Sequence, residues 1–501
     1  MSHLIIAPVI LPLVAGAIIL LLYRRPGAGL AINLAATMAL FGISIALLGG
    51  AASGAYGVYA LGDWPAPYGI VLVQDRLSAL MVALTAALAL SALLYATSGA
   101  LRRDGHFHAL FQFQLFGLNG AFLTGDLFNL FVFFEVLLIA SYGLLLCGEG
   151  GGRDRTRAAL HYVVLNLAGS AVFLVALGII YSVTGTLNMA DLAVKVANVR
   201  SEDAGLLASG SLLLLVVFAL KAALLPLHFW LPAAYSHAAA PVAALFAVMT
   251  KVGVYAILRV YTLIFGTTSV AGAALDWLLP LAILTIVLAG LGALAATSLR
   301  RLVSYLVILS VGTLLAGVSL FNAAGLAAAL YYLLHTTLVT GALYLVADLI
   351  ARSRGGVGDD LASGPAPARA SLGMLFMLGA VAIAGLPPLS GFLGKLLVLE
   401  AAIGHAGMAW LWAGLLGSSL LAIIALSRAG SSLFWHTSGE SKIRVRPAAL
   451  VYAALPLAAS PLLVVFAEPV SDYASATAAQ LLAPEGYILA VLGSSLGAIA
   501  P

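Results

Sequence analysis

Three lysines lie inside long apolar stretches of this 501-residue chain, which contains five lysines in all. They are Lys221, Lys251 and Lys395. A charge at the centre of a membrane-spanning helix costs roughly 2.5–3.5 kcal/mol, so such residues normally face a bundle interior, pair with one another or line a pathway. Burial favours the neutral form of lysine, whereas a nearby carboxylate or entering water favours the charged form. The three lysines are therefore predicted to be proton sites.

Glu135, in FNLFVFFEVLLIASYG, is the one carboxylate near the centre of an apolar stretch. It is the natural counter-ion for Lys221, and a pair that opens and closes would couple proton uptake to a neighbouring event. The alternative is a static buried pair that pins two helices together. A static pair with Glu135 would need only one basic residue. The sequence places three lysines in apolar stretches, and this surplus favours the proton-transfer interpretation.

Histidine relays protons near neutral pH. His335, in ALYYLLHTTLVTGALYLVAD, lies between Lys251 and Lys395 in chain order and is predicted to bridge them, against the alternative of a hydrogen-bonded structural histidine. His228 and His237 fit a water-bridged relay and a packing role equally well. Glu400 either marks the point where the path opens to one surface or is an ordinary helix-end carboxylate. Four other histidines at helix ends or in loops are expected to be solvated: His106, His108, His405 and His436.

The composition identifies the elements that must position these residues. The chain is 63% hydrophobic and 8% charged, with a mean hydropathy of +1.12, which excludes a soluble globular fold. Apolar runs of about 20 residues recur along it, as bilayer spanning requires. The sequence therefore predicts an all-α polytopic membrane protein of about 14 helices. The predicted helices are 3–23, 30–50, 76–99, 108–123, 127–147, 158–184, 208–233, 240–262, 276–297, 301–321, 325–350, 371–402, 408–434 and 447–467.

The positions of basic residues test this count independently, because Lys and Arg concentrate in cytoplasmic loops. Sixteen basic residues fall in loops on one side and four on the other. This alternation predicts that both termini are extracytoplasmic, in a bacterial plasma membrane. The apolar tail 485–500 is too short to span. The net charge of +4 gives no reason to expect a nucleic-acid partner.

Two of the predicted helices are interrupted. The segment 208–233 contains Pro226, and 371–402 contains the run GLPPLSG from Gly385 to Gly391. Proline removes a backbone donor and breaks a helix. The breaks are five helices apart, which predicts two inverted five-helix repeats, a secondary-transporter arrangement. The predicted units are an N-terminal segment 1–107, a first repeat 108–262, a second repeat 276–434 and a C-terminal segment 435–501.

Other chemistries lack their motifs. The sequence has no Walker A motif, no GxGxxG between a strand and a helix, and no soluble domain to hold either. Its single cysteine, Cys147, cannot form an internal disulfide or a cysteine cluster. Haem would need histidines paired at matched depth. No cofactor is expected, and the chain is predicted to be a transporter subunit and not an enzyme.

The stretch LKAALLPLHFWLPAAYSHAAAPVAALFAVMTKVGVYAILR, together with FFEVLLIASY and GLPPLSGFLGK, resembles the antiporter-like subunits shared by respiratory complex I, membrane-bound hydrogenases and Mrp-type Na⁺/H⁺ antiporters. The resemblance covers roughly residues 70–435. It implies a proton path across the middle of the membrane, and the family's path residues correspond to Glu135, Lys221, Lys251, His335 and Lys395.

Within the family, the chain is most similar to the Mrp D subunits in length, helix number and the lysine at 395. It ends too early for the lateral helix of the largest complex I member or the extra helices of the Mrp A subunit. Several relatives carry a lysine where this sequence has Val339. The resemblance implies a Na⁺/H⁺ antiporter subunit that needs other membrane subunits. The alternatives are a proton-pumping subunit of a complex I-like or hydrogenase oxidoreductase, and a quinone- or haem-binding scaffold.

Overall fold

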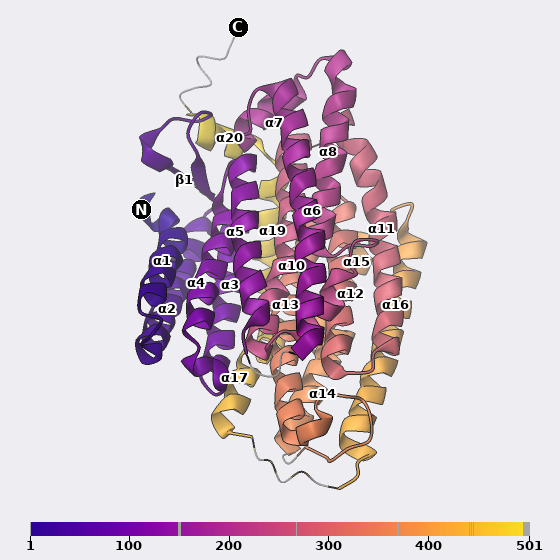
Figure 1. The fold of residues 1–501 in the computed structure, drawn as a ribbon. Coiled ribbons are helices and arrows are strands. Elements are labelled where there is room, and N and C mark those ends of the chain that lie inside the picture. Colours follow the sequence, from indigo (N-terminus) through magenta and orange to yellow (C-terminus); the bar gives the residue numbers. More distant parts are fainter. Residues whose placement is uncertain are drawn as a thin grey trace.

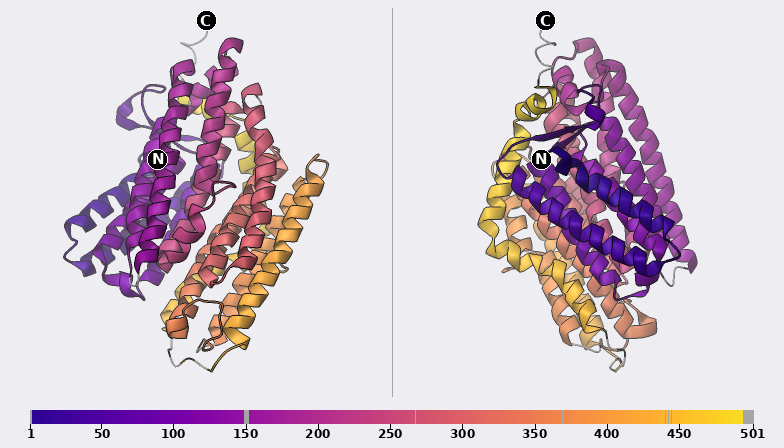
Figure 2. Two further views of the ribbon diagram at one scale, coloured as in Figure 1. Left: turned by 45° about the vertical axis from the view of Figure 1, so that its right-hand side comes forward. Right: turned by 90° about the vertical axis from the view of Figure 1, so that its left-hand side faces the viewer.

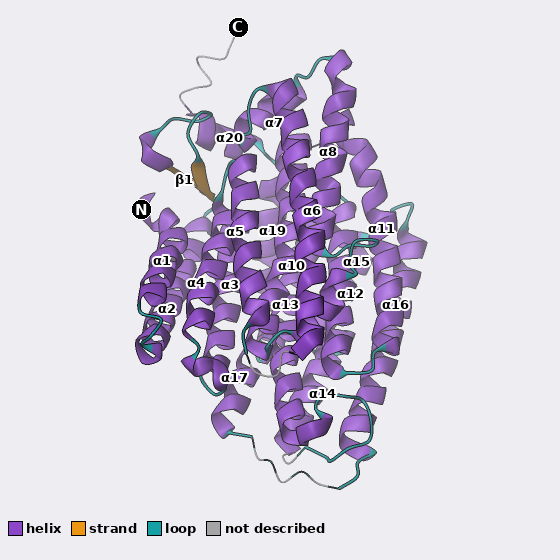
Figure 3. Cartoon of the chain, in the orientation of Figure 1, coloured by secondary structure: helices purple, strands orange, loops and turns teal. Residues whose placement is uncertain are grey.

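The computed structural model describes residues 2–148, 152–266, 268–367, 370–439, 441, 443 and 445–493. These residues form a tall bundle of helices that run side by side, with one small hairpin at the upper end (Figures 1 and 3). The helices are α1 Ser2–Leu21, α2 Pro26–Ala51, α3 Arg76–Ala96, α4 Gly105–Leu123, α5 Leu127–Leu146, α6 Gly152–Thr184, α7 Met189–Ala197, α8 Ser201–Ala222, α9 Trp230–His237, α10 Ala240–Val260, α11 Ser269–Ala295, α12 Leu299–Ser319, α13 Ala323–Arg354, α14 Ala370–Ala384, α15 Ser390–Ala401, α16 Met408–Gly430, α17 Pro447–Leu457, α18 Ala459–Val465, α19 Ala467–Leu482 and α20 Glu485–Leu492.

Each of the predicted spans has a helical counterpart. Twelve helices in the described part of the chain are long and apolar enough to cross a membrane. The other two predicted spans correspond to α4, whose polar residues include Gln112, Gln114 and Asn119, and to the broken pair α14 and α15. The prediction of an all-α membrane protein with broken helices at 208–233 and 371–402 is confirmed.

Burial increases toward the middle of the bundle. Every residue in the apolar window of α10 is buried, as are 89% of those in α12 and α13, compared with 39% in α6, α11 and α16. α10 and α13 are therefore central helices, whereas α1, α2, α6, α11 and α16 form the periphery, as the views in Figure 2 show. A charged side chain on α10 is therefore shielded from lipid and depends on polar partners inside the bundle.

The structure contains elements that the sequence does not predict. Strands β1 Gly57–Ala60 and β2 Val71–Gln74 form an antiparallel hairpin in which Gly57 pairs with Gln74. The last predicted helix ends at residue 467, but the chain remains helical beyond that residue. Helix α19 follows α17 and α18 along the chain and packs against α13. Residues 494–500 of the predicted apolar tail lie outside the described residues.

The hairpin joins the two ends of the chain. The ring of His3 contacts Tyr59, and the ring of Tyr56 contacts Tyr487 of α20, with centroid separations of 5.7 and 6.0 Å. The start of α1 and α20 are therefore at the same end of the bundle, as an even number of spans requires (Figure 1).

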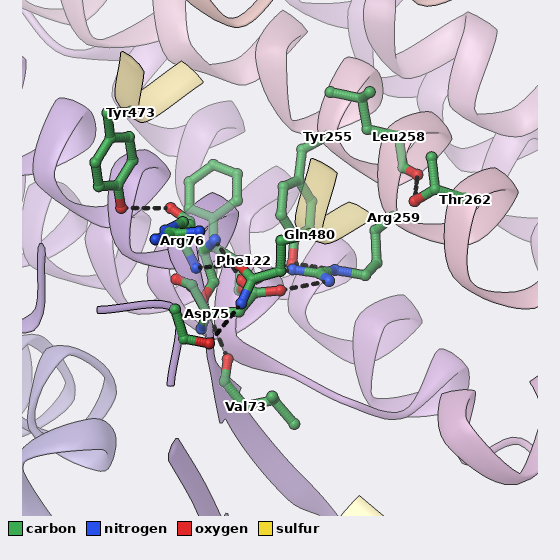
Figure 4. A network of polar contacts seen from close by, with 12 residues as sticks. Val73, Asp75, Arg76, Phe122, Tyr255, Leu258, Arg259, Thr262, Tyr473 and Gln480 are labelled. Carbon is green, nitrogen blue, oxygen red and sulfur yellow. Dashed lines mark hydrogen bonds and ion pairs between the residues drawn. The ribbon is translucent and has the colours of Figure 1, made fainter. Parts of the chain in front are cut away.

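A buried ion pair holds this end together (Figure 4). Asp75 caps α3 through Ser78 and accepts two bonds from Arg259 of α10, at 2.7 and 2.8 Å. The rings of Tyr255 and Tyr487 lie 5.6 and 5.3 Å from the guanidinium carbon of Arg259. Burial alone would raise the pKa of Asp75, but Arg259 holds that pKa below its ordinary value. α19 joins the network where Gln480 accepts a bond from the backbone N–H of Arg76.

Arg259→Gln should destabilise the protein by about 3–5 kcal/mol at neutral pH, because it leaves the Asp75 carboxylate buried without its cation. The matched control is Arg200→Gln, which removes an exposed arginine paired with Glu202 and Asp203 and should cost at most about 1 kcal/mol. Thermal unfolding of the purified complex measures both effects.

Because the pKa of Asp75 is lowered, the stabilisation by the Asp75–Arg259 pair is present above about pH 4 and is lost as the pH falls further. The unfolding temperatures of wild type and Arg259→Gln should therefore become equal in acid. Equal shifts in the two variants at pH 7 would contradict a stabilising role for the pair.

Candidate functional site

Lys221 is buried in the last turn of α8, immediately before the helix breaks. Ala223 takes a left-handed conformation with φ of +62°, and the chain becomes helical again at Trp230. The backbone groups that the break frees are satisfied by protein: the indole of Trp230 donates to the Leu220 carbonyl at 3.1 Å, and Leu225 N–H donates to Thr285 of α11 at 3.0 Å. This arrangement keeps an interrupted helix stable away from water.

Glu135 and Lys221 are connected through α6. The Lys221 Nζ lies 3.3 Å from Asn166 Oδ1. The Ser170 hydroxyl, one turn further along α6, is within hydrogen-bond distance of the Glu135 carboxylate and of the Asn166 backbone carbonyl, and its single hydrogen can be donated to either. Among the described residues, no ion pair of 4 Å or less joins the glutamate directly to the lysine. Neutral polar groups of α6 therefore lie between the glutamate and the lysine that the sequence predicts to form a pair that opens and closes.

Lys251 lies on α10 with its side chain fully buried. Its Nζ is 3.4 Å from the hydroxyl of Ser310 on α12. α10 also touches α8 beside the two lysines, because a Cβ built on Gly253 would lie 2.5 Å from the backbone nitrogen of Ala222. Lys221 and Lys251 thus stand on helices whose backbones meet within two residues of each lysine.

His335 lies on α13, fully buried, and its Nδ1 is 2.7 Å from the hydroxyl of Ser390, the first residue of α15. Its Nε2 has no protein hydrogen-bond partner. The buried hydroxyl of Thr250 on α10 likewise lacks a partner among the described residues, and on α13 the buried hydroxyls of Tyr332 and Thr336 lie close to each other. Val339, one turn beyond His335, is buried and apolar and leaves this stretch of α13 without the lysine of several relatives.

Lys395 lies on α15 and spans the second break. Its Nζ is 2.8 Å from the carbonyl oxygen of Ala384, the last residue of α14, and 2.9 Å from the hydroxyl of Ser419 on α16. Carbonyl groups at a helix C-terminus carry partial negative charge, so the ammonium caps the broken helix. Gly385 in the break has φ of +82°, a conformation that glycine adopts without strain.

The three secondary candidates, His228, His237 and Glu400, lie in three different environments. His228 lies half-buried in the first break, with its Nδ1 unpartnered, whereas His237 is exposed at the end of α9 and bonds locally to the Ala233 carbonyl at 2.8 Å. Glu400 lines a cavity of about 480 Å³ at the end of α15, together with Tyr331, Ser471 and Ser475. The cavity is compatible with the interpretation of Glu400 as an opening to one surface.

Several side chains that join the ionisable groups were missed from the sequence. Asn166 and Ser170 are spaced four residues apart in an apolar helix, a pattern that places both on one helix face and that could have pointed to them. The expectation of a solvated His108 is wrong: the side chain is fully buried and lies 2.9 Å from Asn33 of α2, because α4 begins three residues earlier than predicted and packs there against α1 and α2.

The bundle and its buried groups define a class of protein: a multi-span membrane protein with several ionisable side chains buried on its inner helices. Comparison with known proteins then identifies the family. Residues 124–422 match the model of the NADH:quinone oxidoreductase/Mrp antiporter transmembrane family, and the chain belongs to that family.

The chain is 44% identical to the D subunit of a probable K⁺/H⁺ antiporter from Rhizobium meliloti (strain 1021), over 97% of this chain and 96% of that protein. It is 38% identical to the D subunit of a Na⁺/H⁺ antiporter from Bacillus subtilis (strain 168), over 98% and 100%. A chain in the structure of the Mrp complex from Dietzia sp. DQ12-45-1b superposes with a TM-score of 0.91 at 27% identity, covering 98% of this chain and 100% of that one.

Gly391→Ala should destabilise the second break. A Cβ there would lie 1.9 Å from the Ala382 carbonyl oxygen and 2.8 Å from His335 Nε2, so α15 would have to shift, at a cost of about 1–3 kcal/mol. Gly417→Ala on α16 is the control, since nothing lies within 4 Å of its Cβ position. Thermal unfolding should show a lower midpoint for Gly391→Ala only, and an unchanged midpoint would mean that this contact does not fix α15 against α13.

Proposed function

We propose that this chain is the D-type subunit of a multisubunit monovalent cation/proton antiporter in a bacterial plasma membrane, and that it carries protons through the membrane centre. One observation carries the proposal: five ionisable groups lie on helices that pack successively against one another, and each group has a polar partner on a neighbouring helix. The order is Glu135 on α5, Lys221 on α8, Lys251 on α10, His335 on α13 and Lys395 on α15. The names of the relatives, which are antiporter subunits, support the same conclusion.

The chemistry of the contacts favours reversible protonation. Lys251 and Lys395 are held by hydroxyl and carbonyl oxygens, which accept a bond from an ammonium group without fixing its charge. The buried hydroxyl of Thr250 is next to Lys251 on α10, those of Tyr332 and Thr336 are near His335 on α13, and His335 Nε2 has no partner among the described residues. Buried polar atoms ordinarily bind protein or ordered water. A hydrated connection at this point would replace the lysine that Val339 removes.

The proposal includes an architecture and an orientation. Residues 108–262 and 276–434 would form two inverted repeats, each with one broken helix, and both termini would be extracytoplasmic. The breaks at α8–α9 and at α14–α15, each beside a buried lysine, support the repeats. Such breaks at the membrane midplane are typical of transporters, and the proposed activity is transport and not catalysis of a chemical reaction.

The identity of the transported cation can be measured directly. The family resemblance of the sequence favours Na⁺, whereas one relative is named for K⁺ and another for Na⁺. The path described above contains lysines, a histidine and one carboxylate, a set that suits protons better than a hard metal cation, which prefers clusters of oxygen ligands. We infer that partner subunits contribute to the movement of the cation.

Lys221→Ala and Glu135→Ala should each lower cation/proton exchange at least tenfold, because each removes a protonatable group from the path. Arg200→Ala is the control, since this arginine is exposed at the start of α8 and pairs with the solvent-accessible carboxylates of Glu202 and Asp203. Fluorescence quenching in everted vesicles measures exchange, with Na⁺ and K⁺ in separate runs and complex assembly checked on native gels. Normal exchange in an assembled Lys221→Ala or Glu135→Ala complex would rule out the proposed path.

Gentle affinity purification from native membranes should recover small hydrophobic membrane subunits together with this chain, because an antiporter needs no redox proteins. Mass spectrometry identifies every co-purified chain. Recovery of flavin or iron–sulfur subunits in stoichiometric amount would overturn the antiporter assignment and favour a complex I-like or hydrogenase pump, in which the same proton path is driven by electron transfer.

A further inference from the structure

A buried hydroxyl of the C-terminal segment lies beside the proposed proton path. Ser460, on α18, is fully buried, and its Oγ is 2.9 Å from the Oγ of Ser390, the first residue of α15. The Ser390 Oγ in turn lies 2.7 Å from His335 Nδ1 on α13. Helix α18 packs against both α13 and α15. Ser460 lies outside the two proposed repeats and has no role in the function proposed above.

The Ser460 hydroxyl is turned away from its own helix. A serine or threonine within a helix often donates to the carbonyl one turn earlier. On α13, Thr337 and Thr340 make this bond at 2.7 and 2.6 Å. In the part of the chain that the structure describes, the Ser460 hydroxyl has a single hydrogen-bond partner, the hydroxyl of Ser390. The hydrogen of Ser460 therefore has one acceptor there, and that acceptor belongs to the neighbouring helix α15.

The number of hydroxyl hydrogens favours one direction for this chain of bonds, because each serine hydroxyl carries only one. If Ser460 donates to Ser390, then Ser390 donates to His335 Nδ1 and both hydroxyl hydrogens are paired. In the reverse direction His335 Nδ1–H donates to Ser390 and Ser390 donates to Ser460. The buried hydrogen of Ser460 would then have no acceptor among the described residues. A buried donor without an acceptor is unfavourable, so the first direction is preferred.

This direction gives the two ring nitrogens of His335 different roles. A neutral imidazole has one nitrogen that carries hydrogen and one that accepts a hydrogen bond. Because Nδ1 accepts from Ser390, the hydrogen must be on Nε2. Nε2 is buried and is the nitrogen without a hydrogen-bond partner among the described residues. The proton that His335 can pass on is therefore on Nε2, while the two serines occupy the other nitrogen.

We propose that Ser460 is a positioning residue for His335: it acts through Ser390 to keep Nδ1 an acceptor and so places the transferable proton on Nε2. The inference rests on the proposed function, since it concerns how His335 takes part in the proton path. A second contact holds α18 in place for this role, because the Tyr331 hydroxyl on α13 donates to the Leu463 carbonyl at 2.9 Å. The C-terminal segment thereby contributes to a path whose ionisable groups all lie in the two repeats.

The test uses the assembled complex, purified with isotope-labelled histidine. Solid-state NMR above neutral pH distinguishes a ring nitrogen that carries hydrogen from one that does not, and the signals missing from His335→Gln belong to His335. Wild type should show hydrogen on Nε2 alone. Ser460→Ala and Ser390→Ala should each show a mixture of the two tautomers, whereas Ser460→Thr keeps the hydroxyl and should resemble wild type. Ser91→Ala is the matched control, because this buried serine donates to the carbonyl of Ala87 on its own helix α3, at 3.0 Å.

Cation/proton exchange in vesicles separates the positioning role from the proton path itself. Ser460→Ala should slow exchange severalfold, Ser460→Thr should restore it, and His335→Gln should abolish it. Wild-type histidine signals in both Ser460→Ala and Ser390→Ala would overturn the positioning role, even if His335→Gln stops exchange. Altered signals in those variants, together with normal exchange in His335→Gln, would instead leave the serine chain intact and overturn the proposed path.

Discussion

The hydrocarbon core of a membrane offers no water to an exposed backbone group or charge, and this constraint shapes the whole bundle. Both helix breaks obey it. At the first, Trp230 and Thr285 take up the backbone groups that α8 releases. At the second, the side chain of Lys395 bonds the last carbonyl of α14. Lys221 and Lys395 thus lie beside interruptions whose polar groups already require protein partners, which explains why charge and broken helix occur together at both places.

Two kinds of buried charge occur in the same molecule. Asp75 and Arg259 meet in a two-point ion pair flanked by aromatic rings, and this geometry holds both groups in their charged forms. Lys251 has only a hydroxyl at 3.4 Å. The first arrangement resists a change of protonation, whereas the second tolerates it. The fixed pair joins α3 and α10 at one end of the bundle and so anchors the central helix that carries Lys251.

The sequence predicts the helices and their breaks well, because both follow from local signals: apolar length, proline and the alternation of basic loops. It identifies Lys221 and Glu135 but not the polar groups between them, because the position of Asn166 and Ser170 on α6 depends on how three helices pack. The burial of His108 was likewise invisible, since it depends on Asn33, 75 residues away. The helix α19 was missed because its small and polar residues give no apolar run, although packing against α13 stabilises it.

The 32-residue helix α13 extends about 48 Å, and it carries Tyr331 of the Glu400 cavity, His335 of the proposed path and Arg352 in its last turn. It contacts α3, α10, α12, α15 and α19. Any movement of α13 as a rigid body is therefore transmitted to the cavity near one end of the bundle, to the centre and to the opposite end at the same time.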